Sequence, residues 1–275
     1  MTNNEYTHSI IEWRQEVDRN LRRENGWLAL AGLFWLRKGT NLIGSRPESD
    51  ILLPARAPAR LGTFEFDGDH VTLNVETDLP VELNGASVKS ALLDTDQEDL
   101  PSFITLADIR MVVVRRSKGV GIRLWDNAKK ERQLFPSRQW YPVKEAYCLP
   151  ATYTRYETPR IVKMPDILGA ILDEPMQGFV SFELNGKKYE LVAEELADHR
   201  LFLQFMDLTN RESTYPSGRY HYTDAHENGK VVIDFNKAYS PPCAFTEYAT
   251  CTFPPSENHL DIAIEAGEIY PGHRE

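Results

Sequence analysis

The chain has 275 residues, of which 41% are hydrophobic and 26% charged, and its formal net charge is −10. This composition allows a packed core and argues against a disordered chain. No basic run or stripe interrupts the acidic balance. A nucleic-acid binder needs such a surface to displace the counterions of the phosphate backbone, so we expect no nucleic-acid partner.

The cysteines and the apolar stretches indicate the compartment. Cys148, Cys243 and Cys251 are too few for a disulfide framework. Residues 1–5 lack the basic start and apolar run of a signal peptide. The most apolar stretch, residues 27–36, is too short to span a bilayer. We therefore expect a soluble, cytoplasmic protein with no membrane partner.

One amphipathic helix is predicted over residues 9–24. Ser9 and Glu12 fit a capping box, in which each side chain would bond a free amide at the helix start. The Asn25-Gly26 pair supplies a stop. Apolar side chains recur between these signals at helical spacing. They are Ile10, Trp13, Val17 and Leu21.

After this helix the apolar residues recur with a period of two, which is typical of strands. Asp67-Gly68 and Asn84-Gly85 stand between alternating apolar residues and predict two tight hairpins. Lys118-Gly119 predicts a third turn of this kind. We therefore expect residues 37–135 to form a compact β-sandwich with short connections.

The second half of the chain begins with a segment rich in proline. Residues 136–178 contain six prolines, and because proline cannot donate to a sheet ladder we predict an extended connector there. An antiparallel meander follows, with a turn at Asn185-Gly186. Its later strands are expected at residues 201–205, 231–235 and 260–264.

Together these patterns predict a mainly β protein with two β modules and one N-terminal amphipathic helix. Residues 1–36 would contain the helix and an apolar segment. Residues 37–135 would form the sandwich. Residues 136–275 would form an antiparallel meander, sandwich or barrel that carries a candidate ligand site.

That candidate ligand site rests on strand alternation and on one arginine. Alternation places Asp234 and Asn236 on one strand face. Arg219 offers a rigid fork of donors suited to carboxylate or phosphate. With Tyr215 and Tyr239, these side chains could line a pocket for a small polar or anionic molecule. The alternative is a structural Arg219–Asp234 ion pair, with Asn236 and Tyr239 fixing a loop by local hydrogen bonds.

Whether the chain is an enzyme stays open at this stage. Hydrolysis with Asp234 as general base would need only a positioned carboxylate and water. A thiol-dependent enzyme using Cys243 is an alternative, although its thiolate would need a nearby cation or histidine, and a packed structural thiol is the competing interpretation. The eight-residue separation of Cys243 and Cys251 fits no zinc ribbon or finger, and the seven scattered histidines complete no ligand set. We therefore expect no metal and no cofactor.

A second polar cluster lies in the first module. Arg123 and Trp125 share one strand face, and Asp126 follows them. An arginine stacked over an aromatic ring at this place could frame the mouth of a ligand site. The competing interpretation is that these side chains cover the junction between the two modules.

A distinctive motif near the C-terminus runs from Asp234 to Thr246, with Ser240-Pro241-Pro242-Cys243 at the centre, and continues through Tyr248-Ala249-Thr250-Cys251. This motif resembles the signature of a bacterial and archaeal family of proteins of unknown function, DUF1684. The resemblance extends over nearly the whole chain. Because the family has no assigned activity, the resemblance implies no reaction.

A second motif lies in the first module and comprises Asn41-Leu42-Ile43-Gly44-Ser45, the segment Asp50 to Pro54, and Asn84-Gly85. It resembles the pattern of forkhead-associated (FHA) domains, which are β-sandwiches that read phosphothreonine. Ser45 stands where those domains have a phosphate-binding arginine, and Arg46 is adjacent. The resemblance implies a sandwich fold and offers an alternative function, a protein-interaction module with a protein partner.

Overall fold

The computed structural model describes residues 2–270 and 272. The chain divides into two compact units, each with a hydrophobic core of its own. Unit 1 comprises Met1–Asn20 and Pro136–Glu275, and unit 2 comprises Leu21–Phe135. Strands dominate the regular structure of both units, which confirms the predicted mainly β class.

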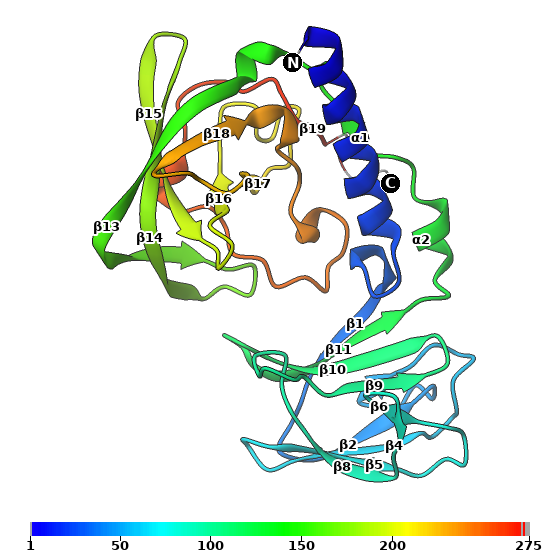
Figure 1. Cartoon of the computed structure of the whole chain (residues 1–275). Helices are drawn as coiled ribbons and strands as arrows, with labels where there is room; N and C mark the ends of the chain where they lie inside the picture. Colours follow the sequence, from blue (N-terminus) through cyan, green and yellow to red (C-terminus); the bar gives the residue numbers. More distant parts are fainter. Residues whose placement is uncertain (1, 271, 273–275) are drawn as a thin grey trace. The chain divides into compact units, whose positions relative to one another are not determined.

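Unit 2 contains two sheets and two short helical elements. Its elements are η1 (Trp27–Ala29), β1 (Leu30–Trp35), β2 (Gly39–Gly44), β3 (Ile51–Leu52), β4 (Gly62–Phe66), β5 (Val71–Val75), β6 (Glu82–Leu83), β7 (Ala86–Ser87), β8 (Ser90–Leu93), β9 (Phe103–Leu106), β10 (Ile109–Arg116), β11 (Gly119–Asp126) and α2 (Lys130–Leu134). One sheet has the strand order β1-β11-β10-β9-β6-β7, and the other has the order β3-β2-β4-β5-β8 (Figure 1).

The two sheets of unit 2 form a sandwich, as predicted, because apolar side chains of both enter one core. Phe64 and Leu73 come from one sheet, Met111 and Ile122 from the other, and all four are fully buried. The predicted hairpins at Asp67-Gly68, Asn84-Gly85 and Lys118-Gly119 are confirmed. Asn84 and Gly85 both have positive φ, which the tight turn requires.

Unit 1 contains a long helix, a six-stranded sheet, a two-stranded sheet and several 3₁₀ turns. Its elements are α1 (Asn3–Arg22), of which the last two residues belong to unit 2, β12 (Gln139–Trp140), η2 (Glu145–Tyr147), β13 (Cys148–Pro165), β14 (Ile171–Leu184), β15 (Lys187–Glu195), β16 (Leu201–Phe205), β17 (Arg219–Tyr222), β18 (Lys230–Asp234), η3 (Phe235–Lys237), η4 (Pro242–Ala244), η5 (Ser256–Asn258) and β19 (Glu268–Ile269).

The six-stranded sheet of unit 1 has the order β17-β16-β15-β14-β13-β18 and curls into a half-barrel (Figure 1). A bridge between Tyr220 and Tyr239 brings the chain after β18 back to β17, at the opposite edge of the sheet. The predicted strands at residues 201–205 and 231–235 are confirmed as β16 and β18. Alternation along β18 also holds, because Ile233 is fully buried in the core while Val232 is half exposed.

The helix begins earlier than the predicted range of 9–24, at Asn3. The predicted capping box at Ser9 is wrong, since Ser9 lies inside the helix and its hydroxyl donates to the Tyr6 carbonyl. Thr2 and Glu5 form the box instead: the Thr2 amide donates to Glu5 Oε2 over 2.7 Å, and the Glu5 amide lies 3.4 Å from Thr2 Oγ1. Within the described residues, no helix has both the length and the apolar character needed to cross a membrane.

The predicted connector over residues 136–178 is wrong, because most of this segment belongs to the long antiparallel hairpin of β13 and β14. Proline is tolerated there for local reasons. Pro159 falls in a bulge, where the pairing register shifts between Arg155 and Arg160. Beyond the bulge the hairpin is a two-stranded ribbon, so that each strand has an edge at which the missing amide of Pro175 is accepted.

The strand predicted at residues 260–264 is also wrong. Leu260 and Ile264 are buried, as a core strand would require, but the segment has no strand conformation. Its first half bonds to the backbone of residues 206–208, where the Leu260 amide donates to the Met206 carbonyl over 2.8 Å and the Ile262 carbonyl accepts from the Leu208 amide over 3.0 Å. At Ile264 the backbone bonds to side chains instead. The Ile264 amide donates to the Asp207 carboxylate over 3.2 Å, and the Ile264 carbonyl accepts from the Arg219 guanidinium over 3.0 Å.

Candidate metal centre

The predicted ligand-site residues of unit 1 lie in separate hydrogen-bond networks. Asp234 and Asn236 do come together, since the Asn236 amide group donates to Asp234 Oδ1 over 2.9 Å. Both oxygens of Asp234 also accept from the Tyr6 hydroxyl of α1, each over 3.0 Å. Arg14 of α1 donates to the Asn236 carbonyl, and burial lowers the pKa of this arginine to about 10. This network fastens α1 to the start of η3.

Arg219 pairs with Asp207, and its side chain is fully buried. Its guanidinium also donates to the carbonyls of Ile264 and Ala266. Asp207 in turn accepts from the Thr209 amide over 2.9 Å. A buried ion pair needs its remaining donors and acceptors satisfied. These contacts satisfy most of them and form a clasp inside unit 1, although Arg219 Nε has no hydrogen-bond partner among the described residues.

The three remaining predicted residues of unit 1 lie outside the strands. Tyr215 precedes β17, and Tyr239 and Cys243 follow β18. The backbone of Tyr239 exchanges hydrogen bonds with Tyr220. Tyr215 and Cys243 are buried in one small cluster with Cys251. The pKa of Cys243 is raised well above its ordinary value, mainly by a hydrogen bond with the Cys251 thiol and secondly by burial. The Cys243 thiol therefore stays protonated at neutral pH, which disfavours its use as a nucleophile.

Arg123 and Asp126, the second predicted cluster, belong to unit 2. The Arg123 guanidinium lies over the Trp27 ring, 5.9 Å from its centroid. Asp126 accepts from Arg56 over 2.8 Å, and this bond holds the pKa of Asp126 below its ordinary value. In the FHA-like loop of the same unit, the Ser45 hydroxyl donates to a backbone carbonyl. Phosphopeptide recognition by this loop stays a prediction.

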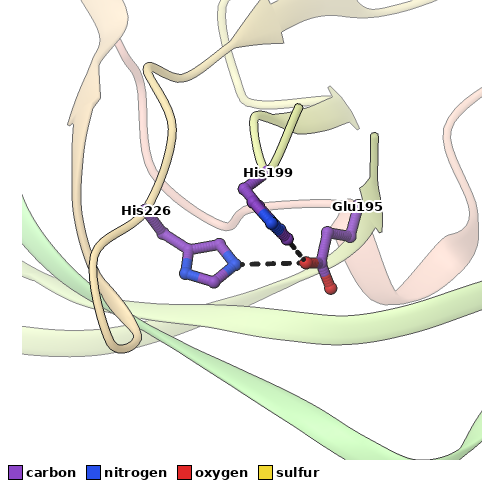
Figure 2. Close-up of side chains that lie close together, drawn as sticks. All are labelled: Glu195, His199 and His226. Atoms are coloured by element: carbon purple, nitrogen blue, oxygen red, sulfur yellow. Dashed lines mark hydrogen bonds and ion pairs between the residues drawn. The ribbon is translucent and has the colours of Figure 1, made fainter. Parts of the chain in front are cut away.

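A different group of side chains comes together at the end of β15. Glu195 is the last residue of β15, His199 lies in the turn before β16, and His226 lies in the loop between β17 and β18. Figure 2 shows both imidazoles directed at one oxygen of Glu195. His199 Nδ1 lies 3.0 Å from Glu195 Oε1, and His226 Nε2 lies 3.3 Å from it.

The spacing of these atoms suits a metal ion. All three ligand atoms lie within 4.8 Å of one another. A tetrahedral ion with bonds of about 2.0–2.2 Å separates its ligand atoms by about 3.4 Å, so small side-chain shifts would accommodate it. The side chain of Glu195 is 6% exposed, that of His226 17% and that of His199 66%. The cluster is therefore anchored in the protein on one side and open to solvent at His199.

Backbone hydrogen bonds hold the two histidines in place. The turn of residues 196–200 is closed by a bond from the Leu196 amide to the Arg200 carbonyl over 2.9 Å. His199 has a φ of 61°, in the left-handed region that disfavours residues with a Cβ atom. The His226 amide donates to the His199 carbonyl over 3.1 Å, which joins the two loops directly. Unfavourable backbone of this kind persists where its surroundings impose it, and it is enriched at functional sites.

The loop that carries His226 is fixed by a tight turn at Asn228-Gly229, both of which have positive φ. The Gly229 carbonyl accepts from the Tyr153 amide over 2.7 Å. A Cβ atom at Gly229 would lie 2.8 Å from the Tyr153 carbonyl, so this close approach requires glycine. The turn therefore sets the position of His226 relative to β13.

The second oxygen of Glu195 has partners of its own. The Tyr153 hydroxyl donates to Glu195 Oε2 over 3.0 Å, and Arg155 Nε lies 3.6 Å from the same atom. Burial by itself would raise the pKa of Glu195, but hydrogen bonds from His199, Tyr153 and His226 outweigh it and hold this pKa below its ordinary value. The carboxylate is thus charged and oriented, with Oε1 toward the imidazoles.

A groove of about 720 Å³ borders the outer side of the His226 loop. Asp224 and Glu227 of the loop line it, together with Thr152 of β13 and Lys230 of β18. The loop thus contacts Glu195 through His226 and lines this groove through other residues. A molecule bound in the groove would contact the segment that positions His226.

None of the three residues of this cluster was predicted from the sequence, whose histidine and cysteine spacing indicated no metal-ligand set. Two local signals were present, because His226 stands just before an Asn-Gly turn and His199 stands in a short polar segment between two strands. What the sequence lacks is the spacing of a known metal motif. The cluster arises from the order of the strands in the sheet, which single-sequence patterns do not fix.

Comparisons with known proteins confirm the family resemblance for the C-terminal half of the chain and not for nearly the whole chain. The family model described as protein of unknown function (DUF1684) matches residues 133–269. A solution structure of an uncharacterized protein from Haloarcula marismortui is 30% identical, with a TM-score of 0.42, over 51% of this chain and 80% of that one. No curated protein matches the chain.

Solved FHA domains match one third of the chain. The FhaA FHA domain, solved in complex with the intracellular domain of Rv3910, is 20% identical over 33% of this chain and 85% of its own, with a TM-score of 0.25. An FHA domain from a study of phosphothreonine-dependent interactions is 21% identical over 33% of this chain and 79% of its own, with a TM-score of 0.24.

The buried clasp makes a direct prediction. Replacing Arg219 by Met leaves Asp207 charged and buried without its cation, which should lower the free energy of unfolding by about 3–5 kcal/mol. The double substitution Arg219→Met with Asp207→Leu should recover part of this loss, because no unpaired charge then remains. Urea denaturation of the three proteins measures both effects. Equal midpoints for wild type and Arg219→Met would contradict a stabilising role for the ion pair.

Proposed function

The chain belongs to the DUF1684 family of proteins of unknown function, and from the geometry of unit 1 we propose that it is a metal-dependent hydrolase acting on a small polar or anionic molecule. Its centre is formed by Glu195, His199 and His226. The observation that carries the proposal is the convergence of two imidazole nitrogens on one carboxylate oxygen, with all three atoms within 4.8 Å.

The donor set selects the class of metal. Two imidazoles and one carboxylate favour a divalent transition metal such as Zn²⁺ or Fe²⁺. Mg²⁺ and Ca²⁺ prefer sites built from oxygen atoms alone. Three protein ligands leave at least one coordination position for water or substrate, which distinguishes catalytic centres from closed structural ones. The exposed side at His199 is where that position would open.

The chemistry follows from the open position. A divalent ion lowers the pKa of a bound water to about 7, so that hydroxide is available at neutral pH. Held by Glu195, His199 and His226, such an ion would supply the nucleophile for hydrolysis of an ester or phosphate ester. This role would make the general base expected at Asp234 unnecessary. Both oxygens of Asp234 already accept from Tyr6.

Tyr153 has a positioning role in this proposal. Its hydroxyl holds Glu195 Oε2 and so directs Oε1 at the imidazoles. Its ring lies against that of His226, with 4.8 Å between the centroids. Hydrogen bonds of this kind orient metal ligands and contribute substantially to metal affinity.

Zinc titration followed by calorimetry tests the centre. Wild type should bind one equivalent of Zn²⁺ at a saturable site, and His226→Ala and Glu195→Gln should each weaken binding more than the 10–100-fold that loss of an outer-shell partner causes. His199→Asn should do the same while keeping the fold, because asparagine accepts the left-handed backbone at this position.

His8→Ala is the matched control. His8 and Glu12 are four residues apart and paired, as His199 and Glu195 are, but both side chains of the control pair are exposed. This variant should bind zinc as wild type does. Zinc-loaded wild type should also hydrolyse p-nitrophenyl acetate or p-nitrophenyl phosphate, and His226→Ala should not. Zinc affinity that is unchanged in all three ligand variants would contradict the centre. Zinc binding without turnover of either ester would contradict the hydrolase.

A further substitution tests the role of Tyr153, which orients a metal ligand without being one. Tyr153→Phe removes the bond to Glu195 Oε2 but keeps the aromatic ring in the core, so it should weaken zinc binding by about 10–100-fold without abolishing it. Competition with a chromogenic zinc chelator measures the change. Wild-type affinity in this variant would show that Tyr153 does not orient the carboxylate.

A further inference from the structure

Arg155 lies beside the candidate metal centre without being one of its ligands. It follows Tyr153 by two residues on β13, so strand alternation places both side chains on the same face. Its Nε atom lies 3.6 Å from Glu195 Oε2, yet its side chain is 66% exposed. The guanidinium is therefore held at the edge of the cluster with most of its surface open to solvent.

The backbone at Arg155 is irregular in a way that suits a functional side chain. Arg155 pairs with Gly178, and the bulge of β13 begins immediately after it. Bulges are enriched next to active sites, where they redirect a side chain. A Cβ atom at Gly178 would lie 2.5 Å from the Tyr153 ring, so glycine here lets that ring and the neighbouring arginine sit close to Glu195.

Arg160, on the far side of the same bulge, shows the contrast. Its terminal nitrogen donates to Glu257 over 3.0 Å, so the end of this guanidinium is used within the protein. Arg155 instead approaches Glu195 with Nε, the atom nearest the chain, and at a distance beyond a normal hydrogen bond. The contact is therefore a loose ion pair made through Nε.

The charges of the cluster favour an anion. A divalent ion bound by one carboxylate and two neutral imidazoles leaves a net charge of +1, and Arg155 adds another positive charge. The guanidinium presents a rigid fork of donors that matches two oxygens of a carboxylate or phosphate. A metal with an open position and an arginine beside it can therefore hold two oxygens of one anionic group.

We propose that the centre takes an oxyanionic substrate, one of whose oxygens occupies the open metal position while another is held by the Arg155 guanidinium. This proposal rests on the proposed metal centre, since without the ion Arg155 faces only a carboxylate. Carboxylates and phosphate monoesters share the required oxygen pair. Arg155 is in this scheme a substrate-binding residue, and Glu195 remains a ligand.

The test uses the full-length protein with saturating Zn²⁺ and two probes, acetate for carboxylates and methyl phosphate for phosphate monoesters. Zinc affinity is measured first by calorimetry for wild type, Arg155→Gln, Arg155→Lys and Arg160→Gln. Arg160→Gln is the matched control, because it removes an exposed arginine of the same strand that pairs with a different glutamate. Probe affinity is then measured on each zinc-loaded protein.

We expect Arg155→Gln to bind zinc within tenfold of wild type and to bind the preferred probe at least tenfold more weakly. Arg155→Lys should fall between the two, because it keeps the charge and loses the fork. Arg160→Gln should match wild type. Zinc binding to wild type with equal probe affinity in wild type and Arg155→Gln would overturn the role of Arg155 alone. Failure of wild type to bind zinc would overturn the metal centre and this proposal with it.

Discussion

The carboxylate of Glu195 is the constraint on which the rim of the half-barrel depends. A charge that is almost entirely buried must be paired and hydrogen-bonded, because its desolvation is otherwise too costly. Glu195 meets this requirement with groups from three separate segments. They are Tyr153 of β13, His199 of the turn between β15 and β16, and His226 of the β17–β18 loop. Satisfying one buried charge thus fixes the relative positions of two strands and two loops.

The buried Arg219–Asp207 pair of unit 1 shows why exposure, and not charge alone, identifies the candidate centre. Neither side chain has exposed surface, and the pair also bonds to the backbone of residues 209, 264 and 266. No substrate could reach them without unfolding the loops around them. Glu195 is nearly as buried, but its partner His199 is two-thirds exposed. A buried carboxylate with a solvent-exposed imidazole offers both anchorage and access.

Much of the fold followed from local sequence signals. Turns at Asp67-Gly68, Asn84-Gly85 and Asn185-Gly186 have a specific backbone requirement, and alternation along residues 231–235 correctly separated core from opposite face. The predictions were wrong where the backbone bonds to groups that are distant in the sequence. Residues 260–264 have the apolar pattern of a strand and begin by bonding to the backbone of residues 206–208, but Asp207 and Arg219 take the hydrogen bonds of Ile264.

The candidate site was the least predictable part for the same reason. Asp234 and Asn236 do lie together, but through the 3₁₀ turn η3 and not through strand alternation, and no local pattern reveals that Tyr6 of the first helix will bond this carboxylate. Glu195, His199 and His226 become neighbours only when β15, β16 and β17 are paired in order and the Asn228-Gly229 turn returns the chain to β13.

The most direct test of the metal centre is anomalous diffraction from crystals of the protein grown with one equivalent of ZnCl₂, recorded on both sides of the zinc absorption edge. We predict one strong peak with His199 Nδ1, His226 Nε2 and Glu195 Oε1 at about 2.0–2.2 Å, and a fourth position filled by solvent. A well-ordered Glu195 cluster with no anomalous peak, or zinc bound only at other residues, would contradict the account.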